Sequence, residues 1–192
     1  AEAPGLIPFT AIQEAPRISI KEKATDQTQL MLGVPAYPFL HKDEYALNVL
    51  ATILGGGMSS RLFPEVRAKR GLAYSVHASV DKYPDTGSFV VQAGVEHGKL
   101  EKAVETILGE FRKIKRTKVS KEELEKAKSY IKGTMTLALE TSDAVAQHAS
   151  TSLISIGRVR PIEDVIKAID KVTVADIQRV AKDILQTNKL NL

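Results

Sequence analysis

An arginine and a tyrosine stand seven residues apart in the stretch that runs from Leu54 to Val76, LGGGMSSRLFPEVRAKRGLAYSV. Arg67 and Tyr74 can each donate hydrogen bonds without acting as a base. A guanidinium and a phenol brought to one surface suit the recognition of peptide carbonyls and of a developing oxyanion. We therefore take Arg67 and Tyr74 as candidate substrate-binding residues and Tyr74 as the candidate catalytic residue.

The same residue types also have an ordinary structural explanation. Cations near a helix C-terminus are favoured by the helix macrodipole, and Arg61, Lys69 and Arg70 fall in the same predicted helix as Arg67. Tyrosines in strands are most often packing residues. Spacing alone therefore leaves both interpretations of Arg67 and Tyr74 open.

Two predicted helices lead up to this pair. Apolar residues recur at helical spacing over residues 42–54, and the glycines at 55–57 then end the helix. Ser59 or Ser60 can cap a second helix that ends at Gly71. The turn at Gly71 would separate the arginine on the helix from the tyrosine on the next element.

A β-hairpin is predicted directly after Gly71. Residues 72–81 alternate as a strand, turn-forming residues follow at 83–87, and apolar alternation resumes over 88–95. One face of the first strand is expected to hold Tyr74, Val76, Ala78 and Val80.

The rest of the chain predicts an α+β fold, with an antiparallel sheet covered by helices on one side. Alternation predicts strands over residues 17–23 and 28–34. A long amphipathic helix is predicted over 98–115. Caps and breakers predict four further helices that start at Ser120 with Glu123, at Ser142, at Pro161, and at Thr173 with Asp176.

Three other motifs suggest chemistry less strongly. His41-Lys42-Asp43-Glu44-Tyr45 approaches an inverted zinc motif, but its fifth residue is a tyrosine, a poor substitute for the second imidazole. We therefore interpret His41 and Glu44 as ordinary residues at a helix start. The 55–60 run lacks the frame and the lysine of a phosphate-binding loop. The basic residues of 112–118 end a helix with acidic residues earlier in it, which favours a solvated face over a nucleic-acid surface.

The Leu54–Val76 stretch resembles the second half-domain of zinc peptidases of the pitrilysin and insulinase family, which includes the mitochondrial processing peptidases. Leu54 to Phe63, then Arg67, then Gly71 to Val76 match in order and spacing. The resemblance extends more loosely over nearly the whole chain.

The resemblance implies a clamshell of two halves around an extended peptide. The first half binds zinc through an H-x-x-E-H helix and a downstream glutamate, and the second contributes an arginine and a tyrosine, here Arg67 and Tyr74. It implies no cofactor in this chain, zinc in the other half, and as partners a zinc-bearing N-terminal half-domain or subunit and a peptide, in a possible homo- or heterodimer. The alternative is a non-catalytic scaffold or core-type subunit of the same family.

Composition agrees with one globular domain that is part of something longer. The 192 residues have a net charge of +4, too mild to require a nucleic-acid or membrane partner, and contain no cysteine. We expect a cytoplasmic setting. Residues 1–16 are expected to be an inter-domain linker and residues 17–192 the half-domain, truncated near a final strand that begins at Lys189.

Overall fold

The protein has the expected α+β fold. The computed structural model describes residue 9 and residues 12–192, so most of the predicted linker, residues 1–16, lies outside the described residues. The strands are β1 (Thr28–Ala36), β2 (Ala73–Lys82) and β3 (Gly87–Val95). The α-helices are α1 (Glu44–Gly55), α2 (Leu100–Arg116), α3 (Lys121–Ala138), α4 (Ser142–Ile156), α5 (Ile162–Asp170) and α6 (Val174–Ile184).

Short helical segments complete the order of elements. A π-helix, η1 (Phe63–Ala68), precedes β2, and two 3-10 helices, η2 (His97–Lys99) and η3 (Thr187–Lys189), precede α2 and follow α6. Within the described residues, no helix combines the length and the apolarity that crossing a bilayer requires.

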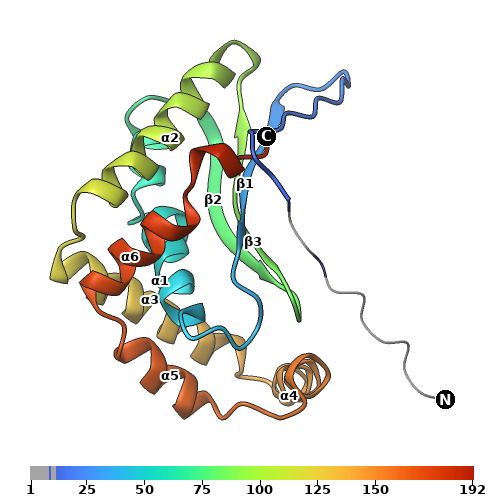
Figure 1. Cartoon of the computed structure of the whole chain (residues 1–192), viewed down its shortest axis with the longest axis vertical. Coiled ribbons are helices and arrows are strands. Elements are labelled where there is room, and N and C mark those ends of the chain that lie inside the picture. Colours follow the sequence, from blue (N-terminus) through green and yellow to red (C-terminus); the bar gives the residue numbers. More distant parts are fainter. Residues whose placement is uncertain (1–8, 10–11) are drawn as a thin grey trace.

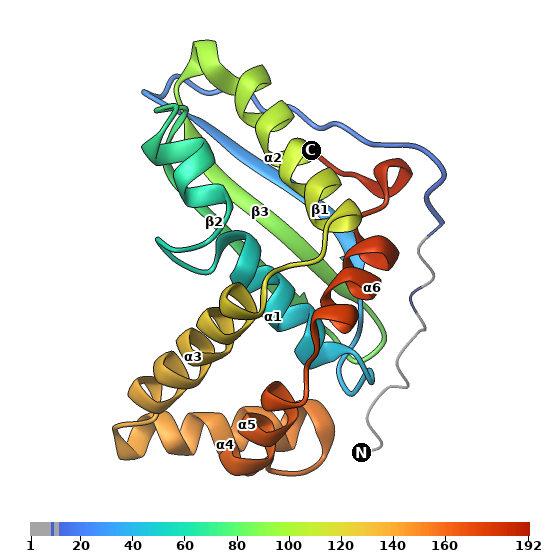
Figure 2. The ribbon, with the colours of Figure 1, turned by 90° about the vertical axis from the view of Figure 1, so that its left-hand side faces the viewer.

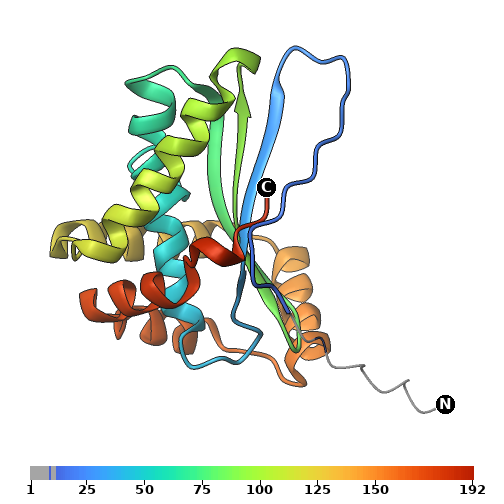
Figure 3. The ribbon, with the colours of Figure 1, turned by 45° about the horizontal axis from the view of Figure 1, so that its top comes forward.

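The sheet is antiparallel and has the order β1-β3-β2, so the predicted hairpin pairs β2 with β3. Figures 1 and 3 show α1, α2 and α6 on one face of this sheet, while the segment before β1 passes the other face. The alternation along β1 follows this arrangement, because Leu30, Leu32 and Val34 are buried whereas Met31 between them is 57% exposed. The predicted single covered face is confirmed.

Helix α1 is the centre of the core. Leu47, Leu50 and Leu54 recur at helical spacing and are completely buried. The helix lies against β2 and is flanked by α3 and α6 (Figure 2). Gly55 ends it in close contact with β2, because a Cβ at that position would lie 2.5 Å from the Ala78 backbone nitrogen. The first glycine of the 55–57 run is therefore required by packing.

Gly55→Ala is expected to lower the free energy of unfolding by about 1–3 kcal/mol, because the added methyl group would force α1 away from β2. Gly133→Ala is the matched control. Gly133 lies inside α3, where a Cβ would meet nothing within 4 Å, so alanine should stabilise the protein by up to about 1 kcal/mol. Denaturant unfolding of both variants measures the difference, and effects of the same sign would contradict this role of Gly55.

The predicted strand over residues 17–23 is wrong. Ile18 and Ile20 are 69% and 83% exposed, and only Arg17 makes a bridge, with Asn191. Asn191 also exchanges two backbone hydrogen bonds with β1, so the last residues of the chain lie between this segment and the sheet. Alternation alone is insufficient, because a strand also needs a partner for its backbone groups.

The predicted helix starts are correct to within a few residues. The Thr173 and Asp176 capping box is present at the start of α6. At α4 the cap is Thr141, one residue before the predicted Ser142, and Gly157 ends the helix in a left-handed conformation with φ 74°. The helix after Ser60 is the short π-helix η1, and it has no side-chain cap.

Candidate functional site

Arg67 lies in the last turn of η1 with its side chain exposed. Its guanidinium carbon is 5.1 Å from the centroid of the Phe63 ring. The Arg67 carbonyl accepts a hydrogen bond from the Gly71 N–H at 3.1 Å, and Gly71 turns the chain with φ 55°. The backbone of Arg67 is thus held by the turn that leads into β2, while the guanidinium extends to solvent.

The charges around Arg67 distinguish it from its neighbours. Lys69 and Arg70 both pair with Glu65, at 2.9 Å and 3.7 Å. Arg61 makes two hydrogen bonds to Glu123, at 2.6 Å and 2.8 Å. Within residues 12–192, Arg67 makes no ion pair, so it is the cation of this stretch whose charge the fold leaves uncompensated.

Tyr74 is the extra residue of a β-bulge in β2. Ala73 pairs with Val95 and Ser75 with Gly94, so no residue of β3 stands opposite Tyr74. The ring is 62% exposed. The prediction that Tyr74 shares a face with Val76, Ala78 and Val80 is therefore wrong, because a bulge shifts the alternation by one residue. The bulge turns the phenol away from the core and leaves it accessible.

The structure thus brings Arg67 and Tyr74 to the two sides of the Gly71 turn, both exposed. The structure contains no hydrogen bond between the two side chains. Their convergence on one bound peptide stays a prediction. Glu65 of η1 pairs with Lys69 and Arg70, which follow η1 directly, and hydrogen bonding from Lys69 lowers the pKa of its carboxyl. The sequence did not indicate this pairing.

The glycine and serine residues at 55–60, before η1, hold this short helix against its neighbours. A Cβ at Gly57 would lie 3.2 Å from the Tyr130 ring of α3. The Arg61 N–H donates to the Ile53 carbonyl at 2.9 Å, and hydrogen bonds to Glu123 raise the pKa of Arg61. Glu123 therefore binds Arg61 and does not complete the capping box predicted with Ser120. This run fixes η1 to the end of α1 and to α3.

The family of the chain follows from comparison with known proteins. Residues 2–131 match the family described as the peptidase M16 inactive domain. The chain belongs to this family. The match confirms the resemblance to the second half-domain of pitrilysin and insulinase peptidases, and the description as an inactive domain agrees with the expectation that zinc is bound outside this chain.

Relatives of this M16 domain include proteins named as uncharacterized zinc proteases. One from Streptomyces coelicolor is 33% identical over 91% of this chain and 38% of its own length. Another, from Bacillus subtilis, is 31% identical over 85% of this chain and 40% of its own length. The chain therefore spans about two-fifths of these relatives. A protease structure from Helicobacter pylori has a TM-score of 0.85 at 25% identity, covering 93% of this chain and 43% of that one.

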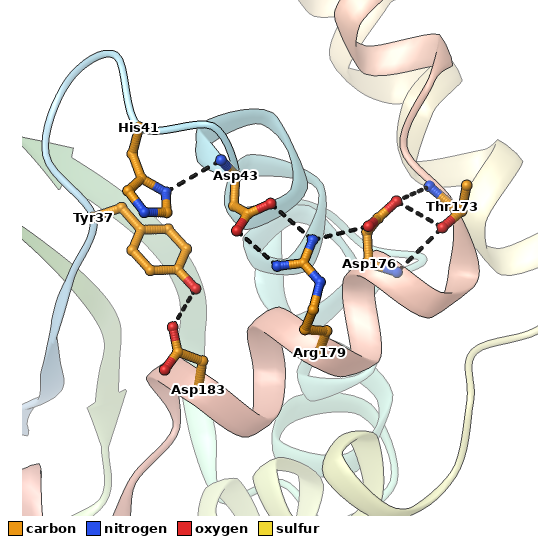
Figure 4. Close-up of polar contacts among 7 residues, drawn as sticks. All are labelled: Tyr37, His41, Asp43, Thr173, Asp176, Arg179 and Asp183. Atoms are coloured by element: carbon orange, nitrogen blue, oxygen red, sulfur yellow. Dashed lines mark hydrogen bonds and ion pairs between the residues drawn. The ribbon is translucent and has the colours of Figure 1, made fainter.

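In this M16 domain, residues 41–45, which approach a zinc motif, make stacking contacts, hydrogen bonds and ion pairs within the chain. His41 stacks on Tyr37 with ring centroids 3.9 Å apart, and its Nδ1 accepts a hydrogen bond from the Asp43 N–H at 3.2 Å (Figure 4). Asp43 in turn binds the Arg179 guanidinium through both oxygens, at 2.7 Å and 2.8 Å, and these bonds lower the pKa of the carboxyl. Burial and a hydrogen bond to Asp183 raise the pKa of the Tyr37 phenol.

Glu44 and Tyr45, the fourth and fifth residues of the 41–45 stretch, share a guanidinium. Arg160 binds the Glu44 carboxylate and donates to the Tyr45 hydroxyl at 3.0 Å, and the Lys82 nitrogen lies 3.9 Å from Glu44. Glu44 is only 3% exposed. Glu44 is the first residue of α1, as predicted, but the sequence did not indicate that its charge is buried and paired. Among the described residues, no group of three His, Cys, Asp or Glu is placed to hold a metal ion.

Proposed function

We propose that this chain is the substrate-binding half of a zinc-dependent peptidase whose zinc site lies in a separate N-terminal half. One observation carries the proposal. Arg67 is exposed and has no carboxylate partner, and the turn at Gly71 separates it from Tyr74, which a bulge leaves exposed to solvent. Relatives more than twice as long as this chain, named as zinc proteases, support a parent protein of that kind.

Arg67 and Tyr74 would act on the peptide through hydrogen bonds. Arg67 is proposed to donate to backbone carbonyls of an extended substrate and so to hold the scissile bond in place. Tyr74 is proposed to donate its phenolic proton to the oxygen of the scissile carbonyl as charge develops there. Zinc bound in the other half would supply an activated water as the nucleophile.

Reconstitution from separate halves tests this proposal. The zinc-bearing half and this chain are expressed apart, and turnover of a quenched fluorescent peptide is measured for each half and for the mixture. Turnover should require both halves, and metal analysis should find zinc only in the other half. Stoichiometric zinc in this chain, or full activity of the zinc half by itself, would refute the proposal. A folded, inactive pair would favour a scaffold subunit.

A further inference from the structure

A cavity of about 560 Å³ has a lining that includes neither Arg67 nor Tyr74. Its walls come from the start of α1, the end of β2, the second half of α3, and α4. Figures 1 and 3 show α4 beside the tip of the β2–β3 hairpin, and residues of α4 and of the end of β2 line the cavity. Its volume falls within the range of about 300–1,000 Å³ that is usual for small-molecule sites.

The charged side chains that line the cavity are all positive. Lys82 and Arg160 face it, and among the described residues that line it none is an aspartate or a glutamate. Glu44 contacts both cations but lies outside the lining. Two cations against one carboxylate leave one positive charge in excess, and the side chains of Lys82 and Arg160 are only 17% and 18% exposed. Because these cations are largely removed from water, an anion entering the cavity would be attracted more strongly than at an open surface.

Helix α4 lines the cavity with neutral polar groups, and its aspartate, Asp143, is not among the lining residues. Between Ala144 and Ile156 it contains no Asp, Glu, Lys or Arg. Gln147, Thr151 and Ser152 line the cavity and can donate hydrogen bonds to an anion. The carboxylate of a ligand would therefore find two cations and several neutral donors in the same cavity.

The remaining wall is apolar. Met135 and Leu139 of α3, Ile156 of α4 and Val165 of α5 line it, together with Phe39. An aliphatic group of a ligand would bind favourably against this wall, because it would be removed from water there. Burial lowers the pKa of the Lys82 ammonium while Glu44 acts in the opposite direction, so a second carboxylate beside this cation would offset the cost of its burial.

We propose that this cavity is a binding site for a monocarboxylate with a medium-sized apolar group, with the carboxylate at Lys82 and Arg160. The ligand can be a free aliphatic acid or the C-terminus of an apolar peptide, since both present the same chemistry. The proposal does not rest on Arg67, on Tyr74 or on the peptidase function.

The test is calorimetric titration of the 192-residue chain with octanoate at low ionic strength. Saturable 1:1 binding is expected, with a Kd on the order of 1 mM for so small a ligand. Octanol and octylamine should bind at least about tenfold more weakly, because each lacks the charge that pairs with the two cations. Absence of saturable octanoate binding, or equal binding of octanol, would overturn the proposal.

Variants locate the binding. Lys82→Met keeps the length of the side chain and should weaken octanoate binding by about 10–100-fold. Lys102→Met, at a 60% exposed lysine of α2, is the control and should bind as the native chain does. If Lys82→Met fails to fold, Ser152→Leu fills the cavity without changing any charge and should also abolish binding. Unchanged binding in the folded Lys82→Met or Ser152→Leu variant would place the ligand elsewhere and refute the site.

Two further ligands distinguish a free aliphatic acid from a peptide C-terminus as the preferred ligand. N-acetyl-Leu-Leu with a free C-terminus and the same dipeptide with a C-terminal amide are titrated in parallel. Tighter binding of the free dipeptide than of octanoate identifies a peptide C-terminus as the preferred form, and the reverse order identifies a free acid. An amide that binds as tightly as the free dipeptide would contradict recognition of a carboxylate.

Discussion

Tyr74→Phe in the intact protein is expected to lower kcat for peptide hydrolysis by about 10²–10³-fold, with a much smaller change in KM. The phenolic proton is proposed to bond the carbonyl oxygen chiefly when that oxygen carries negative charge, so its loss should affect the transition state more than the bound substrate. The ring is 62% exposed and belongs to a bulge, so removing its hydroxyl should leave the fold intact. Steady-state kinetics on a fluorogenic peptide measure the effect.

Tyr83→Phe is the matched control for this experiment. Tyr83 is 55% exposed and lies in the turn between β2 and β3, so it reports the effect of losing an exposed phenol from the same hairpin. Its kinetics should equal those of the native protein. Zinc content and thermal unfolding of both variants should also be unchanged. If Tyr74→Phe turns over peptide as fast as Tyr83→Phe, Tyr74 has no role in oxyanion stabilisation.

Local sequence signals predicted the elements of the fold well. The capping box of Thr173 with Asp176, and the turn at Gly71, depend on residues only a few positions apart. The apolar stripe of α1, with Leu47, Leu50 and Leu54, needs only a core on one side. These features can be predicted because they depend on contacts between residues close in sequence, or on burial against any apolar surface.

The features that sequence missed depend on distant partners. The bulge at Tyr74 exists only relative to β3, since Ala73 and Ser75 pair with consecutive residues there. Ile18 and Ile20 have the period of a strand, but both are exposed, and their segment bonds to residues 190–192 through the backbones of Arg17 and Ser19 rather than along its length. The alternation of apolar residues carries no information on either point. The choice of Arg67 and Tyr74 as site residues stays a prediction, whereas the face predicted for the tyrosine is wrong.

The ion pair between Glu44 and Arg160 is the clearest example of a contact that the sequence did not indicate. The two residues are 116 positions apart, and no spacing rule connects them. In the structure the Arg160 guanidinium binds Glu44 and Tyr45, the fourth and fifth residues of the stretch that approaches a zinc motif. The buried Glu44 carboxylate compensates the charges of Lys82 and Arg160, and a measurement of the free energy of unfolding can test this role.

Glu44→Ala is expected to lower the free energy of unfolding by about 3–5 kcal/mol, among the largest effects of any single substitution in this chain. The carboxylate is 4% exposed, and its removal leaves Arg160 and Lys82 facing each other without a compensating charge. Urea unfolding of the 192-residue chain, analysed by linear extrapolation, measures the loss. Glu105→Ala is the control, because its pair with Lys102 is 3.9 Å long and both side chains are at least 60% exposed; its effect should stay within about 0.5 kcal/mol.

A double variant separates the value of the pair from the penalty of an orphaned charge. Glu44→Leu with Arg160→Leu removes both charges together, and it should be more stable than Glu44→Ala because less uncompensated charge is left buried. Glu44→Gln keeps the shape and some hydrogen bonds, so it should fall between the native chain and Glu44→Ala and remain measurable if the alanine variant fails to fold. A loss below about 1 kcal/mol for Glu44→Ala would mean that Lys82 and Arg160 are adequately solvated without the carboxylate, which conflicts with their burial.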